Sequence, residues 1–154
     1  MNNKLLTLLA IFLVAISIAS VCAAELTKEN DFDGKFKMNI TENATFEEVV
    51  DGICSSALLS NQSWSDNETA VVCYYENPMD SVLSVLKSNS NYMDDPTIDG
   101  NLTILEDTLY NDGDTASYSF KYIVGVSSPQ NTTVFVACND LDLAKEYANT
   151  IVFE

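Results

Sequence analysis

Two short motifs in this sequence have the residue types of a serine acyl-transfer site. Ser84-Val-Leu-Lys87 matches the S-x-x-K pattern, in which a lysine one helical turn away activates the serine. Ser65-Asp-Asn67 matches the S-D-N element of the same machinery. However, S-D-N precedes S-x-x-K here, and the K-T-G triplet that completes the set does not occur. We therefore interpret both matches as coincidence and predict no catalytic serine.

The 23 Asp and Glu residues offer two further kinds of chemistry. Two carboxylates about 5 to 9 Å apart can hydrolyse a glycosidic bond, but among so many acids such pairs arise by chance. Asp94, Asp95 and Asp99, and the turn Asp112-Gly-Asp114, supply oxygen ligands that calcium prefers, although neither group fits the EF-hand spacing. We therefore predict no metal site and no cofactor, and keep an extracellular hydrolase with two carboxylates as the alternative function.

Composition excludes other functions. The chain has seven lysines, no arginine and no histidine, and its formal net charge is −16. Without histidine there is no Ser-His-Asp set and no imidazole ligand, and without clustered cations we expect no nucleic-acid partner. Trp64 and Tyr74-Tyr75 offer a stacking platform for sugar rings, although core packing is the commoner role of aromatic residues. These features favour an acidic globular protein that is not an enzyme.

The first 24 residues have the pattern of a secretory signal peptide. Lys4 supplies the positive charge, residues 5–18 are apolar, and Ala23 and Ala24 are small residues suited to a cleavage site. We therefore predict that residues 1–24 are a signal peptide and that the protein is secreted or held at the cell surface.

Two alternatives for this segment stay open. The apolar run extended to Val21 reaches the lower length limit for an uncleaved membrane anchor, and Cys22 is a candidate for lipid attachment after cleavage. Residues 25–154 contain no second long apolar run, so we expect no membrane span once the signal peptide is removed. A cell-wall or surface component is the partner class that this location suggests.

The sequence contains six Asn-x-Ser/Thr sites, more than its content of these residues gives by chance. Such sequons accept N-linked glycans in exported proteins when the asparagine lies on accessible surface. Together with the signal peptide they predict a glycoprotein. The candidate acceptors are Asn39, Asn43, Asn61, Asn67, Asn101 and Asn131.

Three cysteines follow the signal peptide, namely Cys54, Cys73 and Cys138. An odd number allows one disulfide and one free thiol. We favour a bridge between Cys54 and Cys73, because these two residues close the shorter loop; the alternative is that all three are buried as small apolar residues.

The first part of the exported chain divides into four segments. Residues 25–34 are polar and charged, which predicts a flexible leader, and residues 35–154 form a single domain. In residues 35–40 apolar and polar side chains alternate, as in a half-buried strand. Residues 41–66 leave helix and strand open. Residues 69–75 are apolar on both faces and predict a central strand.

Two helices are expected in the rest of the chain. Asn77-Pro78 is a good helix start, followed by apolar residues at helical spacing. Asn139-Asp140 caps the second helix in the same way. The two apolar stripes are Met79, Val82, Leu83 and Leu86, and Leu143, Ala144, Tyr147 and Ala148.

Strands and turns account for the remainder. Residues 88–100 have turn signals and predict a loop. Strands are expected near 102–104, 118–126 and 133–138, with hairpin turns at 111–114 and 127–131, and a last short strand at 151–153. We therefore predict an α+β fold in which an antiparallel sheet of about five to six strands packs with two short helices. A β-sandwich with incidental helices is the alternative.

Several segments give the chain a family resemblance. Its signal peptide and the segments DFDGKFKMNIT, NLTILE and NDLDLAKEYANTIVF resemble small secreted, sequon-bearing proteins of methanogenic archaea. This resemblance covers structural segments and implies no catalytic residues. The order of elements, which ends in a helix and then a strand, is similar to the PsbP/Mog1-like α/β/α sandwich. That similarity implies an accessory or binding role without catalysis.

Overall fold

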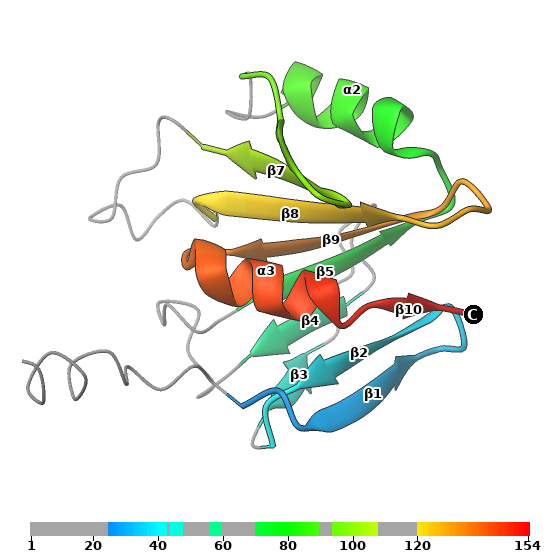
Figure 1. The fold of residues 1–154 in the computed structure, drawn as a ribbon, viewed down its shortest axis with the longest axis vertical. Helices are drawn as coiled ribbons and strands as arrows, with labels where there is room; N and C mark the ends of the chain where they lie inside the picture. Colours follow the sequence, from blue (N-terminus) through cyan, green and yellow to red (C-terminus); the bar gives the residue numbers. More distant parts are fainter. Residues whose placement is uncertain (1–24, 43, 48–55, 60–69, 90–93, 108–119) are drawn as a thin grey trace, which may run out of the picture.

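A computed structural model of the chain describes residues 25–42, 44–47, 56–59, 70–89, 94–107 and 120–154. These ranges contain ten strands in two antiparallel sheets and two helices (Figure 1). The strands are β1 (Lys28–Phe32), β2 (Phe36–Ile40), β3 (Thr45–Glu47), β4 (Ser56–Leu59), β5 (Ala70–Tyr75), β6 (Thr97–Asp99), β7 (Leu102–Glu106), β8 (Tyr122–Ser127), β9 (Thr133–Cys138) and β10 (Val152–Phe153), and the helices are α2 (Met79–Asn89) and α3 (Leu141–Asn149).

The larger sheet has seven strands in the order β3-β4-β5-β9-β8-β7-β6, and the smaller sheet has the order β1-β2-β10. The predicted α+β class is confirmed, whereas the number of strands exceeds the predicted five to six. The second sheet is the main addition, and its inner face packs on the larger one as in a sandwich.

The larger sheet is covered on both faces, which creates two hydrophobic cores. One core lies between this sheet, helix α3 and the smaller sheet, and the other lies under α2. Successive residues of each central strand point to opposite faces, so Val136 belongs to the first core and Phe135 to the second. This explains why the central strands are apolar along their whole length.

Strands β5 and β9 form the centre of the sheet, as their composition predicts. They pair over six residues, from Ala70 opposite Cys138 to Tyr75 opposite Thr133, and every residue of β9 is buried. Strand β8 differs from the prediction. Its alternation suggests one wet face, but Ile123 and Gly125 are buried beneath α2.

Both predicted helices are present. Asp140 is the N-cap of α3, where its Oδ1 accepts hydrogen bonds from the backbone N–H groups of Asp142 (2.9 Å) and Leu143 (3.1 Å). The buried residues of α3 are the four that its periodicity predicts. In α2, Val82 is buried, and the other residues of its stripe pack half-buried against the same core.

The prediction of a flexible leader over residues 25–34 is wrong, because Lys28–Phe32 form strand β1. Phe32 is buried, and its ring stacks on Phe36 at a centroid distance of 4.5 Å. The turn between β1 and β2 is stabilised by a hydrogen bond of 2.7 Å from the Gly34 N–H to Oδ1 of Asp31. Gly34 has φ +66°, a conformation that glycine adopts without strain. The polar segment is held in the sheet by one buried aromatic residue, by this turn and by backbone pairing with β2.

Two further differences concern short strands. The predicted loop over 88–100 contains β6, which forms a hairpin with β7. In the region where helix and strand were both open, the structure has strands β3 and β4, which pair with each other. The predicted hairpin turn at 111–114 and the signal peptide at 1–24 lie outside the described residues. No helix within the described ranges has the length and apolar character needed to cross a bilayer.

Candidate functional site

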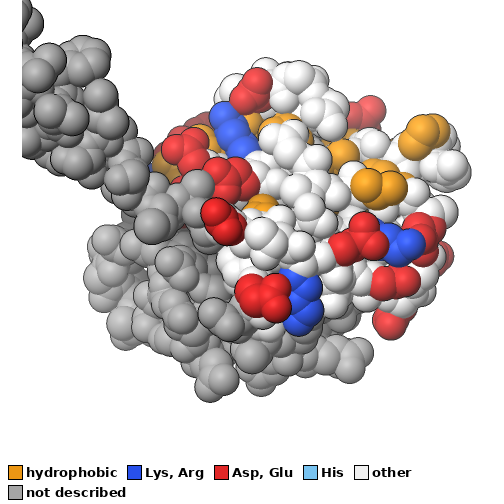
Figure 2. Space-filling view, turned by 60° about the horizontal axis from the view of Figure 1, so that its bottom comes forward, with side chains coloured by type: hydrophobic (Ala, Val, Ile, Leu, Met, Phe, Trp, Pro, Cys, Tyr) orange, Lys and Arg blue, Asp and Glu red, His pale blue; other side chains and the backbone are white. Residues whose placement is uncertain are grey.

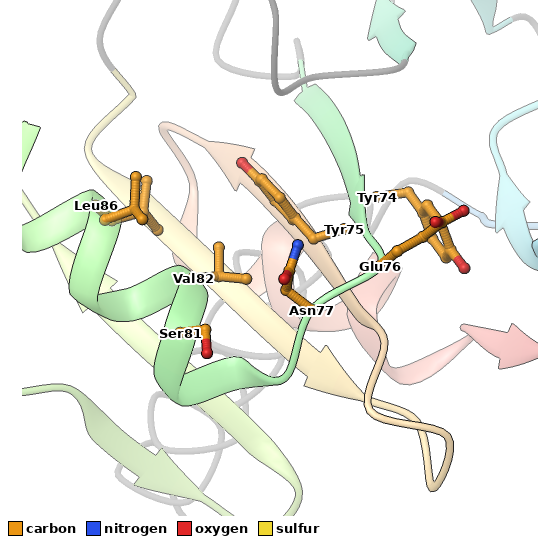
Figure 3. A pocket seen from close by; sticks show the side chains of 8 residues that line it. Tyr74, Tyr75, Glu76, Asn77, Ser81, Val82 and Leu86 are labelled. Atoms are coloured by element: carbon orange, nitrogen blue, oxygen red, sulfur yellow. The ribbon is translucent and has the colours of Figure 1, made fainter.

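A groove of about 410 Å³ lies between the end of β5 and helix α2 (Figure 3). This volume is within the range of sites for small ligands. One wall is apolar and comes from the helix, and the other combines aromatic rings with polar groups from the end of β5. The lining residues are Tyr74, Tyr75, Glu76, Asn77, Ser81, Val82, Val85 and Leu86.

Tyr74 and Tyr75 do not form one flat platform, because neighbouring strand residues point to opposite faces of the sheet. Figure 3 shows their side chains leading away from each other. Tyr75 lies on the α2 face, edge-to-face with Phe135 at 5.8 Å. Tyr74 stacks on Phe36 at 6.1 Å, and Nζ of Lys35 lies 5.0 Å from the centre of its ring. Trp64 lies outside the described residues, and of the two tyrosines it is Tyr75, half-buried, that lies on the α2 face.

A glycine lies beneath the first residue of α2. Gly125 of β8 pairs with Phe135 of β9, and a β-carbon at position 125 would lie 2.5 Å from Cε1 of Phe135 and 2.8 Å from Cε of Met79. Glycine thus allows the phenylalanine ring and the first residue of α2 to approach the sheet. The helix rests on β8 at this point, and the groove opens between the helix and Tyr75.

A buried hydroxyl fixes the connection from β5 to α2. Oγ1 of Thr133 donates a hydrogen bond of 2.9 Å to the backbone carbonyl of Asn77. Thr133 is fully buried and lies opposite Tyr75 in the sheet. Asn77 is therefore held at the place where the strand ends and the helix begins, which sets the position of the groove's polar rim.

The groove favours uncharged or positively charged molecules. Burial raises the pKa of Tyr75, so its hydroxyl stays protonated at neutral pH and can donate a hydrogen bond. Asn77 and Ser81 add neutral polar groups, and among the described residues that line the groove Glu76 is the one carboxylate and none is a lysine. A ligand with an apolar face and hydrogen-bonding edges matches this lining.

The S-x-x-K motif does not form a catalytic pair in the structure. Ser84 is exposed on α2, and Nζ of Lys87 donates a hydrogen bond of 2.8 Å to Oδ1 of Asp95. This hydrogen bond, together with the charge of the lysine, lowers the pKa of Asp95. The lysine is thus bound to a carboxylate, and the Ser65-Asp-Asn67 element lies outside the described residues.

Two of the acids suggested for calcium pair with different lysines. Asp95 pairs with Lys87 of α2, whereas Asp99 pairs with Lys145 of α3 at 2.9 Å. These helices cover opposite faces of the larger sheet. Asp112 and Asp114 lie outside the described residues, and within the described ranges no three acidic or cysteine side chains are close enough to hold a metal ion.

The described surface is acidic, and its lysines lie among acids. Figure 2 shows acidic side chains across one face of the molecule, with the visible lysines beside them. Besides the two pairs above, Lys37 pairs with Glu154, and Lys121 lies 3.9 Å from Glu106. Such exposed pairs add little stability. Because acids outnumber lysines in the chain, the surface keeps an excess of negative charge.

Three of the six candidate sequons are in described parts of the chain. Asn101 is exposed in the turn between β6 and β7, and Asn131 is exposed, with φ +63°, in the turn between β8 and β9. Because β7 and β8 are antiparallel neighbours, the start of β7 lies beside the end of β8. Both turns therefore lie at the same end of these strands. Asn39 is half-buried on the outer side of β2. The remaining candidates, Asn43, Asn61 and Asn67, lie outside the described residues.

The cysteines have two different states. Cys73 is disulfide-bonded, whereas Cys138 is a buried thiol. Burial raises the pKa of Cys138 to about 11. Cys54 lies outside the described residues, as does Cys22, so the pairing of Cys54 with Cys73 stays a prediction.

Comparisons with models of protein families, with curated proteins and with solved structures give no significant match to this chain. Function is therefore inferred from the groove and from the sequons. No motif or residue spacing in the sequence indicates the groove directly. Its lining residues come from the end of β5 and from α2, and the fold brings these two elements together.

Proposed function

We propose that this protein is a secreted or cell-surface acidic glycoprotein module that binds an uncharged or cationic surface component without catalysis. The observation that carries this proposal is the lining of the groove. An apolar helix wall faces the protonated phenol of Tyr75, and neutral polar groups lie at the rim. Such a combination suits recognition of a molecule with one apolar face, for example a sugar ring.

The sequons support an extracellular location. Asn101 and Asn131 are both exposed, and their turns are neighbours at one end of the sheet. Tyr75, the last residue of β5, lies opposite Thr133 at the beginning of β9. Glycans on the two turns would therefore extend into solvent from the end of the sheet where β5 ends. The signal peptide expected from the sequence agrees with this location.

The alternative, a hydrolase with two carboxylates, has less support from the groove. Such an enzyme needs two acids on either side of the bond that it breaks. The groove contributes one carboxylate, that of Glu76, among its lining residues. Binding is therefore the function that its geometry favours.

Retention on cell-envelope material tests the proposal. The protein is incubated with envelope fractions of the organism that encodes it, and the bound fraction is measured as a function of concentration. Val85 lines the groove and is 45% exposed, so Val85→Glu places a charge on the apolar wall without disturbing the core. We expect about tenfold weaker retention of an uncharged component, because binding of its apolar face would remove water from the new carboxylate without giving it a partner. A cationic component would instead be retained more strongly by this variant.

Ile98→Glu is the matched control. Ile98 is 66% exposed on β6 and does not line the groove, so its substitution adds the same charge at a different site. We expect retention equal to that of the unaltered protein. Equal weakening by both substitutions, or no retention of the unaltered protein, would contradict binding through the groove.

A further inference from the structure

The sequon at Asn131 has an accessible asparagine but an inaccessible hydroxyl. Asn131 is exposed at the tip of a turn, so an attached glycan would meet no obstacle. An enzyme that reads Asn-x-Thr must also recognise the hydroxyl two residues later. In this sequon that residue is Thr133, whose side chain is fully buried. Exposure of the asparagine alone is therefore not sufficient for recognition.

Two sets of contacts hold Thr133 in place. Its hydroxyl donates to the carbonyl of Asn77 at 2.9 Å. Its backbone lies in the sheet between Tyr75 of β5 and Ser127 of β8. To present this hydroxyl to an enzyme, the beginning of β9 must separate from both neighbouring strands and from the β5–α2 connection.

The turn itself is also held by hydrogen bonds. The backbone N–H of Thr132 donates to Oγ of Ser128 at 3.1 Å, and the N–H of Gln130 donates to the same oxygen at 3.2 Å. The Asn131 N–H donates to the Ser128 carbonyl at 3.3 Å. All three residues of the sequon are thus fixed in a hydrogen-bonded hairpin.

The second exposed sequon has the same arrangement. Asn101 is exposed, but Thr103 is only 9% exposed. Thr103 lies in β7 between Ile98 of β6 and Gly125 of β8. Two sequons on separate hairpins therefore share an exposed asparagine and a buried threonine.

We infer that Asn101 and Asn131 are glycosylated before their strands join the sheet, and that the folded protein is not an acceptor at either site. This inference rests on the proposed function as an exported glycoprotein, and adds the order of events. In the transfer, the asparagine amide nitrogen loses a proton and bonds to the anomeric carbon of a lipid-phosphate-linked oligosaccharide. The bond from that carbon to the phosphate oxygen breaks, and the lipid phosphate leaves. Modification then accompanies export of the unfolded chain.

An acceptor assay with a purified oligosaccharyltransferase and its lipid-linked donor tests this order. Protein made in a host without this enzyme is compared with a synthetic peptide of residues 127–136, which contains the same sequon without the sheet. An Asn-Ala-Thr tripeptide added after Glu154, which is exposed, serves as an accessible acceptor on the folded protein. Mass spectrometry measures the rate at each asparagine.

We expect the peptide and the added tripeptide to be modified, and Asn101 and Asn131 of the folded protein to react at least about tenfold more slowly, because only the rare unfolded population is an acceptor. Modification of Asn131 in the folded protein at the rate of the added tripeptide would overturn the inferred order, and would leave the proposed glycoprotein standing. Failure of the 127–136 peptide alone would instead contradict glycosylation at this sequon.

Discussion

The ring of Phe135 lies over Gly125, its direct partner in the neighbouring strand, and fills the space where a β-carbon of residue 125 would stand. The same ring is in edge-to-face contact with Tyr75 at 5.8 Å. Met79, the first residue of α2, also approaches Gly125. One glycine thus allows the start of the helix to lie close to the sheet.

Gly125→Ala should therefore destabilise the protein. The added methyl group would lie 2.5 Å from Phe135 Cε1 and 2.8 Å from Met79 Cε, and overpacking of this kind costs about 1 to 3 kcal/mol. Urea unfolding measures the change in free energy. Ser127→Ala, at an exposed position of the same strand, should stay close to the unaltered protein.

A second substitution identifies the cause of that loss. Phe135→Leu removes the ring atoms nearest to position 125. The double variant should therefore lose less free energy of unfolding than the two single variants lose in sum. Additive effects of Gly125→Ala and Phe135→Leu would show that contact between these residues is not the reason.

Asp140→Ala should weaken helix α3. Oδ1 of Asp140 accepts two backbone N–H groups at the beginning of the helix, and loss of such a cap costs about 0.5 to 2 kcal/mol. Asp142→Ala removes a carboxylate from the first turn without removing the cap, and its cost should be below about 1 kcal/mol. Thermal unfolding compares the two. Equal losses would mean that charge, and not capping, is the source of the effect.

The protein should lose stability between pH 9 and pH 11. The pKa of Cys138 is 9.0 in the unfolded chain and about 11 in the folded one, so the unfolded chain releases the thiol proton first and gains from rising pH. The loss from this group is on the order of 2 to 3 kcal/mol. Burial also raises the pKa of Tyr75, and the hydrogen bond from Lys37 to Glu154 raises the pKa of Lys37. Both groups act in the same direction as pH rises.

Cys138→Ala isolates the contribution of the thiol. The variant should show a smaller decrease in the free energy of unfolding between pH 9 and pH 11, whatever its stability at pH 7. Unfolding in urea at several pH values gives this slope. The same slope in both proteins would contradict a buried, protonated thiol at position 138.

The thiol of Cys138 should also be unreactive in the folded state. It is buried, and the thiolate form that reacts with disulfide reagents is rare at pH 8 when the pKa is about 11. Cys73 is in a disulfide, so in protein that lacks the signal peptide and has the predicted Cys54–Cys73 bridge, titration with an aromatic disulfide reagent should give no rapid reaction, and Cys138 should react after unfolding in urea. Rapid labelling of Cys138 in the folded protein, identified by mass spectrometry, would show that the position is accessible.

Elements with strong local patterns could be predicted from the sequence. The apolar stripe of α3 and the cap at Asp140 are recognisable without tertiary information, and all four predicted inner residues are buried. Strand β1 could not be predicted in this way. Its polar sequence contains one buried side chain, that of Phe32, which depends on stacking with Phe36 across a turn. Tertiary contact here overrides local preference.

The candidate site was less predictable than the fold. Asn77 and the stripe of α2 were expected, but as a helix start and a core-facing surface. The groove forms between the end of β5 and one side of α2, and its shape depends on how the helix packs on the sheet. The inaccessible hydroxyls of the two exposed sequons could not be predicted for the same reason, because burial of Thr103 and Thr133 depends on neighbouring strands.

The intact mass of the protein isolated from the organism that encodes it tests the central claim, that this is an exported glycoprotein, most directly. We predict a chain that begins near Glu25, carries glycan mass on Asn101 and Asn131, and is two hydrogens lighter for the disulfide of Cys73. A mass that corresponds to the full sequence from Met1, with unmodified asparagines, would contradict the proposed location and function.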